Sequence, residues 1–197
     1  KLCFSSSAAV YGDNPAVPKT KDMLPEPNSP YAVTKLDGEF YCRMFHEQGR
    51  LRTACMRYFN VFGPRQDPTS QYAAAVPIFI TKALAGEPLT IFGDGEQTRD
   101  FVYVKDVVAA NVFLAEHEDL TGVYNVGYGK SMTVNDLAGR IVELTDSQSP
   151  ITHTDPRPGD VKHSMASTEK LNKTGLELQD NLNGCLSETI RFFAGDR

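Results

Sequence analysis

The chain has 197 residues, 41% of them hydrophobic, and its 25 acidic residues against 20 Lys and Arg give a formal net charge of −5. This length and composition are typical of a globular chain with one large domain or two small ones. The acidic balance leaves no basic stripe for nucleic acid, and the apolar runs around residues 73–80 and 107–115 are too short to span a bilayer. We therefore expect neither nucleic acid nor a membrane as a partner.

Cysteine and histidine usage indicates neither a disulfide framework nor a metal site. Cys3, Cys42, Cys55 and Cys185 are scattered and form no Cys-x-x-Cys pair. That pattern predicts reduced, mostly buried thiols in a cytoplasmic protein. The four histidines lack the spacing of metal ligands, so we expect no bound metal.

The first elements predict a parallel α/β unit. An apolar strand over residues 2–5, resumed at 10–11, leads into a surface loop over 12–28 that is rich in Pro, Lys and Asp. Ser29 and Pro30 then begin a helix, because Ser caps free backbone N–H groups and Pro suits the first helical position. Apolar residues recur at helical spacing before an expected end near Gly49, namely Val33, Leu36, Phe40 and Met44.

The remaining segments alternate between the two kinds of element. The β-branched and aromatic segment 53–59 predicts a second strand, which completes the strand–helix–strand unit. Further helices are predicted over 74–84, 106–116, 134–144, 168–174 and 182–193, and further strands over 89–92, 100–104, 123–126 and 150–154. This interleaving predicts a smaller α/β lobe that wraps onto the parallel sheet.

Tyr31 and Lys35 form a candidate acid–base pair. Four residues apart on one helix, they share a face. A free phenol has a pKa of about 10 and is a weak base at neutral pH. A neighbouring ammonium group and the positive end of a helix both favour the phenolate form. A tyrosine in this setting can take a proton from a substrate hydroxyl, although a Tyr-x-x-x-Lys spacing alone is more often a chance surface pattern.

Three serines add to this pair. Ser5, Ser6 and Ser7 end the first strand, and in open α/β sheets the carboxyl ends of strands carry ligand-binding groups. A serine hydroxyl there can bind the same substrate oxygen that Tyr31 deprotonates.

Four segments carry a family resemblance, which extends in register over the whole chain. They are Ser-Ser-Ser-Ala-Ala-Val-Tyr-Gly-Asp (5–13), Ser-Pro-Tyr-Ala-Val-Thr-Lys (29–35), Arg-Tyr-Phe-Asn-Val-Phe-Gly-Pro-Arg (57–65) and Thr-Arg-Asp-Phe-Val-Tyr-Val-Lys-Asp (98–106). The sequence resembles the extended short-chain dehydrogenase/reductases, and among them the NAD-dependent nucleotide-sugar 4-epimerases of the UDP-glucose and UDP-N-acetylglucosamine type.

The resemblance implies an α/β fold, the C-terminal part of a Rossmann-type doubly wound parallel sheet plus a smaller α/β substrate-binding lobe. Residues 1–65 would belong to the NAD-binding domain and residues 66–197 mainly to the nucleotide-sugar lobe, with 98–126 returning to the first domain. Tyr31 would be the catalytic base and acid, Lys35 would hold the nicotinamide ribose, and Ser7 would be the hydroxyl partner. The other residues implied at the cofactor are Ser5, Ser6, Tyr58, Phe59 and Asn60, of which Asn60 would also reach the substrate.

The implied reaction is oxidation and re-reduction at C4 of a UDP-hexose on a tightly held NAD. Related dehydratases and decarboxylases have acidic residues directly after the catalytic Ser or Thr. Here those positions are Ala8 and Ala9, which cannot move a proton and so favour epimerisation. The alternatives are an NAD-dependent nucleotide-sugar dehydratase or reductase and an inactive nucleotide-sugar-binding fragment.

The resemblance also assigns the nucleotide sugar. Arg99 and Arg157 would clamp the diphosphate, since Arg offers bidentate geometry, and Asp160 would reach a ribose hydroxyl. The uracil would meet Thr90, Ile91 and Phe92, and Ala73 and Ala74 would lie near the phosphates.

Ser164 stands where this family controls the space beside the sugar's C2 substituent. A Tyr there would favour unsubstituted hexoses, whereas Ser leaves room for an N-acetyl group. We therefore expect UDP-N-acetylglucosamine and UDP-N-acetylgalactosamine to be accepted as well as UDP-glucose and UDP-galactose.

The glycine-rich dinucleotide fingerprint of the family does not occur in these 197 residues. We expect the chain either to be the visible part of a longer protein or to be a true fragment without the adenosine half of the NAD site. Family members commonly dimerise through the Tyr-Lys helix, so a homodimer is expected, with Tyr41 and Phe45 on the outer helix face.

Overall fold

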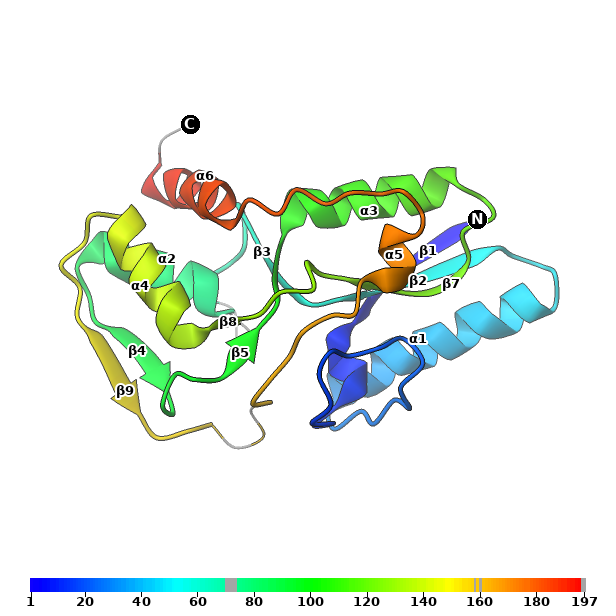
Figure 1. Cartoon of the computed structure of the whole chain (residues 1–197), viewed down its shortest axis with the longest axis horizontal. Helices are drawn as coiled ribbons and strands as arrows, with labels where there is room; N and C mark the ends of the chain where they lie inside the picture. Colours follow the sequence, from blue (N-terminus) through cyan, green and yellow to red (C-terminus); the bar gives the residue numbers. More distant parts are fainter. Residues whose placement is uncertain (70–73, 158, 160, 196–197) are drawn as a thin grey trace.

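The structure is a computed structural model, and it describes residues 1–69, 74–157, 159 and 161–195 (Figure 1). The strands are β1 (Leu2–Ser7), β2 (Thr53–Tyr58), β3 (Asn60–Phe62), β4 (Leu89–Phe92), β5 (Thr98–Arg99), β6 (Phe101–Tyr103), β7 (Gly122–Val126), β8 (Met132–Thr133) and β9 (Ile151–Thr154). The helices are the short 3₁₀ helix η1 (Ala8–Tyr11), α1 (Pro30–Glu47), α2 (Ala75–Ala85), α3 (Val104–Glu116), α4 (Val134–Leu144), α5 (Glu169–Asn172) and α6 (Leu182–Ala194).

A three-stranded parallel sheet forms one half of the molecule. Its order is β1-β2-β7, and Ser7, Tyr58 and Val126 stand side by side at the carboxyl ends of the three strands. Helix α1 covers one face of the sheet and α3 the other (Figure 1). With helices on both faces, the central strand β2 is buried along almost its whole length. The mixed α/β architecture predicted from the sequence is confirmed.

Helix α1 begins as predicted but packs through a different face. The Ser29 side chain accepts a hydrogen bond from the Ala32 backbone N–H, and Pro30 is the first helical residue. The buried residues are Ala32, Glu39 and Cys42, whereas the predicted apolar series is largely exposed, with Phe40 44% accessible.

The reason for this packing is a close approach between α1 and β1. A Cβ built on Gly38 would lie 2.2 Å from the Phe4 ring. Only a helix face of small or hydrogen-bonded side chains fits at this separation, so the bulkier apolar residues point outward.

The segment after β1 differs from its predicted strand. Residues 8–11 form η1, whose N-cap is Ser7, and the Ser7 Oγ accepts a hydrogen bond of 3.1 Å from the Ala9 backbone N–H. Val10 and Tyr11 are buried as expected. Their apolar character predicts that they are buried, but it does not predict a strand. Two residues are too few to show the hydrophobic periodicity that distinguishes a strand from a helix.

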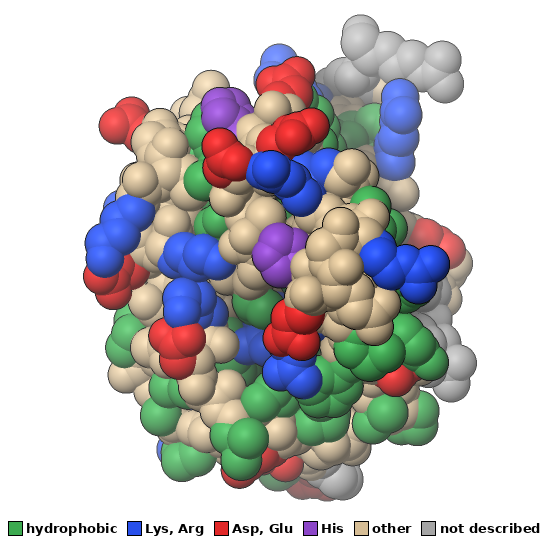
Figure 2. Space-filling view, turned by 90° about the vertical axis from the view of Figure 1, so that its right-hand side faces the viewer, with side chains coloured by type: hydrophobic (Ala, Val, Ile, Leu, Met, Phe, Trp, Pro, Cys, Tyr) green, Lys and Arg blue, Asp and Glu red, His purple; other side chains and the backbone are tan. Residues whose placement is uncertain are grey.

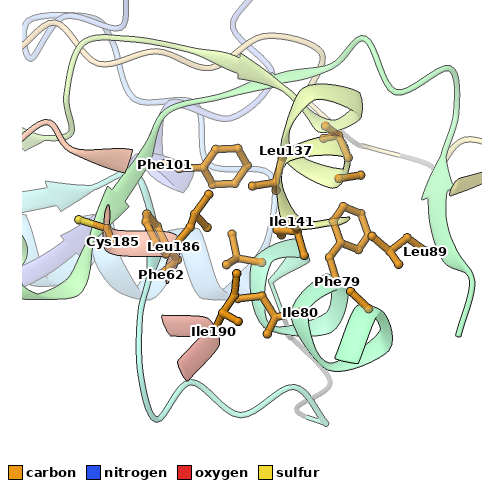
Figure 3. Packing of buried hydrophobic residues seen from close by; sticks show 14 of the residues in the cluster. Phe62, Phe79, Ile80, Leu89, Phe101, Leu137, Ile141, Cys185, Leu186 and Ile190 are labelled. Carbon is orange, nitrogen blue, oxygen red and sulfur yellow. The ribbon is translucent and has the colours of Figure 1, made fainter. Parts of the chain in front are cut away.

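The other half is a lobe with its own core. Helices α2, α4 and α6 pack around buried residues from several segments, among them Phe79, Ile80, Leu137 and Ile141 (Figure 3). The parallel pair β4-β9 borders this core, and the antiparallel pair β5-β8 connects it toward the first sheet (Figure 1). In the part of the chain that the structure describes, no helix is both long and apolar enough to cross a membrane.

The cysteines agree with the prediction of reduced thiols. All four are free, and Cys42, Cys55 and Cys185 are buried. Burial raises the pKa of the Cys185 thiol to about 11 and also raises the pKa of Cys42. Such thiols stay protonated and inert at neutral pH.

Asp100 joins the two halves of the molecule. It stands between β5 and β6 with no exposed surface, and its carboxylate accepts backbone N–H groups of Tyr128, Gly129 and Ala166 at 2.9, 3.0 and 3.0 Å. Burial raises the pKa of Asp100, and the three N–H donors oppose that shift. One side chain thus ties the end of β7 to the segment before α5.

We predict that Asp100→Asn lowers the free energy of unfolding by about 1–3 kcal/mol, because either orientation of the amide sets an N–H group against a backbone donor. Chemical denaturation measures the effect, with Asp37→Asn, an exposed acid on α1, as the control. Equal free energies of unfolding for Asp100→Asn and the control would show that the Asp100 carboxylate does not stabilise the contact between the end of β7 and the segment before α5.

Candidate active site

The structure brings Tyr31 and Lys35 together at the start of α1. Lys35 Nζ donates a hydrogen bond of 2.8 Å to the Ser5 carbonyl and lies 5.6 Å from the centre of the Tyr31 ring. It lies equally far from the Phe4 ring. Tyr31 is half exposed. The ammonium group is thus held at the end of β1, with the phenol beside it.

The three serines of β1 do not share one side. Ser5 and Ser7 point to the same side of the strand: the Ser5 hydroxyl lies 3.1 Å from the Tyr58 hydroxyl, and Ser7 caps η1. Ser6 points to the opposite side, where it is buried and donates to a Glu39 carboxylate oxygen. The structure therefore keeps the Ser6 side chain away from the predicted cofactor site, because successive strand residues alternate between faces.

A buried ion pair lies behind the serines. Arg57 donates to both carboxylate oxygens of Glu39, at 2.9 and 2.7 Å, and the two side chains are 3% and 6% exposed. Burial disfavours the charge on Arg57, but the hydrogen bonds to Glu39 and the nearby Tyr11 outweigh it and raise the pKa of Arg57. Sequence reasoning missed this pair. A lone Arg inside an otherwise apolar strand was the available signal.

A cavity of about 530 Å³, here called the lobe cavity, lies between α2, β4 and β5. Among its lining residues are six predicted from the sequence: Asn60, Ala74, Thr90, Phe92, Arg99 and Arg157. The Arg157 guanidinium stacks 3.8 Å from the centre of the Phe92 ring. Ile91 also borders it, but that side chain is buried in the lobe core, as the alternation of a strand requires.

A second cavity of about 300 Å³, the strand-end cavity, lies where β1 and β2 end. The predicted residues that line it are Ser7, Tyr58, Phe59, Asn60, Arg99 and Ser164. Ala8, Ala9 and the buried Lys19 also line it, and Lys19 was not singled out from the sequence. Asn60 and Arg99 border both cavities, so the two share part of their walls.

Some predicted residues stand apart from the cavities. Neither Tyr31 nor Lys35 is among the described residues that line them; Lys35 reaches the carbonyl of Ser5, two residues before Ser7 of the strand-end cavity. Ala73 and Asp160 lie outside the described residues.

The comparison with protein families bears directly on this arrangement. The model of the NAD dependent epimerase/dehydratase family matches residues 1–127, which include β1, α1 and the strand ends. The chain belongs to this family.

Other members of the epimerase/dehydratase family are similar along almost the whole chain. The UDP-glucose 4-epimerase of Mycolicibacterium smegmatis is 36% identical over 190 residues, which cover 96% of this chain and 60% of that protein. The chain thus spans about three fifths of the length of the curated relatives it matches.

Solved structures of the family superimpose closely. The UDP-N-acetylglucosamine 4-epimerase of Methanobrevibacter ruminantium, solved with UDP-N-acetylmuramic acid, is 46% identical with a TM-score of 0.95, and the match covers 99% of this chain and 63% of that one. The UDP-glucose 4-epimerase of Thermotoga maritima, solved with UDP-glucose, is 39% identical with a TM-score of 0.92, over 98% of this chain and 63% of that one.

Proposed function

We propose that the protein is an NAD-dependent 4-epimerase of UDP-hexoses. The observation that carries this proposal is that Asn60 and Arg99 line both cavities, while the Tyr31–Lys35 pair stands at Ser5, two residues before Ser7 in the lining of the strand-end cavity. One cavity offers aromatic and cationic groups for a nucleotide, and the other offers hydroxyl groups for a sugar. The relatives named above as 4-epimerases support the same reaction.

The residues at the end of β1 fit the nicotinamide half of NAD. An ammonium group has three N–H donors. Lys35 donates one to the Ser5 carbonyl, so two remain for ribose hydroxyls. Tyr31, Lys35 and Ser5, with Tyr58, Phe59 and Asn60, are the residues that would hold this half. When bound, NAD supplies a reversible hydride acceptor for the sugar carbon.

The proton chemistry belongs to Tyr31 and Ser7. Tyr31 takes the proton from O4 of the sugar. It returns the proton after the 4-keto sugar has rotated in the pocket to present its other face. Because the Ser7 Oγ accepts from the Ala9 N–H, its own hydroxyl proton is available for the same sugar oxygen.

The nucleotide would occupy the lobe cavity. Thr90 and Phe92 would contact the uracil together with the Ile91 backbone, and Ala74 would lie near the phosphates. Arg99 and Arg157 would bind the diphosphate, and the stacking of Arg157 on Phe92 holds its planar group in one orientation. By resemblance, Ala73 and Asp160 would complete this site at the phosphates and a ribose hydroxyl.

Two alanines favour epimerisation over elimination. Ala8 and Ala9 line the strand-end cavity, and no carboxylate stands among the described residues of its lining. Dehydration needs an additional acid and base near C5 and C6 of the sugar. The described lining offers none, so we favour simple inversion at C4 over the dehydratase alternative.

Ser164 supports acceptance of N-acetylated substrates. It is half-buried in the lining of the strand-end cavity, and its backbone N–H donates to the Thr98 carbonyl at 3.1 Å. The position is therefore fixed, and its short side chain leaves space beside the sugar. The M. ruminantium relative is named for UDP-N-acetylglucosamine.

We also propose a cytoplasmic homodimer. The face of α1 that points away from the sheet exposes apolar groups, including Phe40, Tyr41 and Met44. Hydrophobic side chains gather on the lower part of the face in Figure 2, the side on which α1 lies in Figure 1. Pairing of two such helices would cover these groups, and four free thiols fit a reducing compartment.

We predict that Tyr31→Phe lowers the rate of UDP-galactose to UDP-glucose conversion by about 10²–10⁴-fold while binding of UDP-glucose is kept, because only the proton transfer is removed. The assay uses protein expressed from its complete reading frame, with Tyr41→Phe on the same helix as control. Undiminished turnover by Tyr31→Phe, or a 4-keto-6-deoxy product from the unaltered protein, would contradict the proposal.

We predict that Ser164→Tyr abolishes turnover of UDP-N-acetylglucosamine but spares UDP-glucose, because the phenol fills the space beside C2. Steady-state rates with both sugars measure the split, and Ser131→Tyr, at an exposed serine outside this cavity, is the control. Equal loss for both sugars would refute a selective role for this position.

A further inference from the structure

Lys19 is a buried lysine in the loop between η1 and α1; the residue is 2% exposed and belongs to the lining of the strand-end cavity. Its backbone is fixed on both sides. The Lys19 N–H donates to the Met165 carbonyl, and its carbonyl accepts from the Ser167 N–H, each at 2.8 Å. The Asn125 side chain also donates to this carbonyl at 2.8 Å. These hydrogen bonds hold the backbone from which the Lys19 side chain extends.

The charge of Lys19 has no described counter-ion. Its Nζ donates to the Asn14 carbonyl, and no carboxylate pairs with it in the part of the chain that the structure describes. Burial accordingly lowers the pKa of Lys19. Lysines are rarely buried without a partner, because desolvation of the ammonium group is costly. Two of its three N–H donors remain for another acceptor.

The surroundings of Lys19 favour an anion. Among the described residues that line the strand-end cavity, the other charged side chain is Arg99, which is also positive. The rest of this lining is neutral, with small residues such as Ala9 and Gly12 and amides such as Asn28. An anionic group entering the cavity would thus meet the ammonium group of Lys19, and no carboxylate stands among the described residues of the lining.

Lys19 lies at the strand-end cavity and is not in the lining of the lobe cavity. Arg99 and Asn60 border both cavities, whereas Lys19 borders only the strand-end cavity, together with Ser7 and Ser164. Under the proposed function this is the space for the sugar, so the group that meets Lys19 belongs to the hexose.

We infer that Lys19 binds a carboxylate on the hexose and makes UDP-sugars with an acidic substituent, such as UDP-uronic acids, preferred substrates of this site. The inference rests on the proposed function for the placement of the sugar. Lys19 would select substrates by the charge of a sugar substituent, whereas Ser164 in the same cavity would select them by the size of the C2 substituent.

The test compares UDP-glucuronic acid with UDP-glucose, which differ only in a carboxylate against a hydroxymethyl group at C6. We expect Lys19→Met to raise KM for UDP-glucuronic acid by about tenfold, the worth of one charge-assisted hydrogen bond, and to change KM for UDP-glucose less than about twofold. Lys21→Met is the matched control. It removes the same charge two residues along the loop, but Lys21 already pairs with Asp22.

Equal changes for both sugars, or failure of the unaltered protein to bind UDP-glucuronic acid, would overturn the inference. Turnover of UDP-glucose by Lys19→Met reports that the variant is folded, and Lys19→Gln serves if it is not. Calorimetric measurement of the binding of both sugars distinguishes a failure of the Lys19 inference from a failure of the proposed epimerase function. A carboxylate preference that depends on Lys19 without any turnover would reject the epimerase reaction and keep the charge-based recognition.

Discussion

The close approach of α1 to β1 is the constraint on which the site depends. Gly38 lets the helix lie against the Phe4 ring at a distance that no side chain would permit. That contact brings Lys35 within 2.8 Å of the Ser5 carbonyl at the end of the strand, with Tyr31 one turn earlier. A wider helix–sheet separation would leave the amine in solvent. The missing side chain of Gly38 thus lets α1 approach β1 closely enough for the acid–base pair to stand at the strand end.

Buried charges hold the rest of the arrangement, each in a different way. The Glu39–Arg57 pair ties α1 to β2 beneath the serines and is satisfied within the protein by two hydrogen bonds. Asp100 is satisfied by three backbone N–H groups and ties the sheet to the segment before α5. Lys19 differs, since its described partner is a single carbonyl. Glu39, Arg57 and Asp100 thus have their charges satisfied within the protein, whereas a buried amine with few partners that lines a cavity is available to a ligand.

Much of the architecture follows from local signals in the sequence. Ser29 and Pro30 begin α1, Thr133 caps α4 by accepting the Asp136 N–H, and Gly86 ends α2 in a left-handed conformation. These features depend on neighbouring residues alone, so they are readable without the fold. The packed face of α1, the side to which Ser6 points and the burial of Lys19 depend on long-range contacts. No local pattern encodes those, because the partners come from distant segments.

The central claim is that Tyr31 and Ser7 meet the same oxygen of a sugar held in the strand-end cavity. A crystal structure of the protein with NAD and UDP-glucose tests it most directly. The account predicts both hydroxyl oxygens within about 2.6–3.2 Å of O4 of the hexose, with the uridine in the lobe cavity. A sugar bound in that cavity with O4 turned away from Tyr31, or a uridine bound elsewhere, would contradict it.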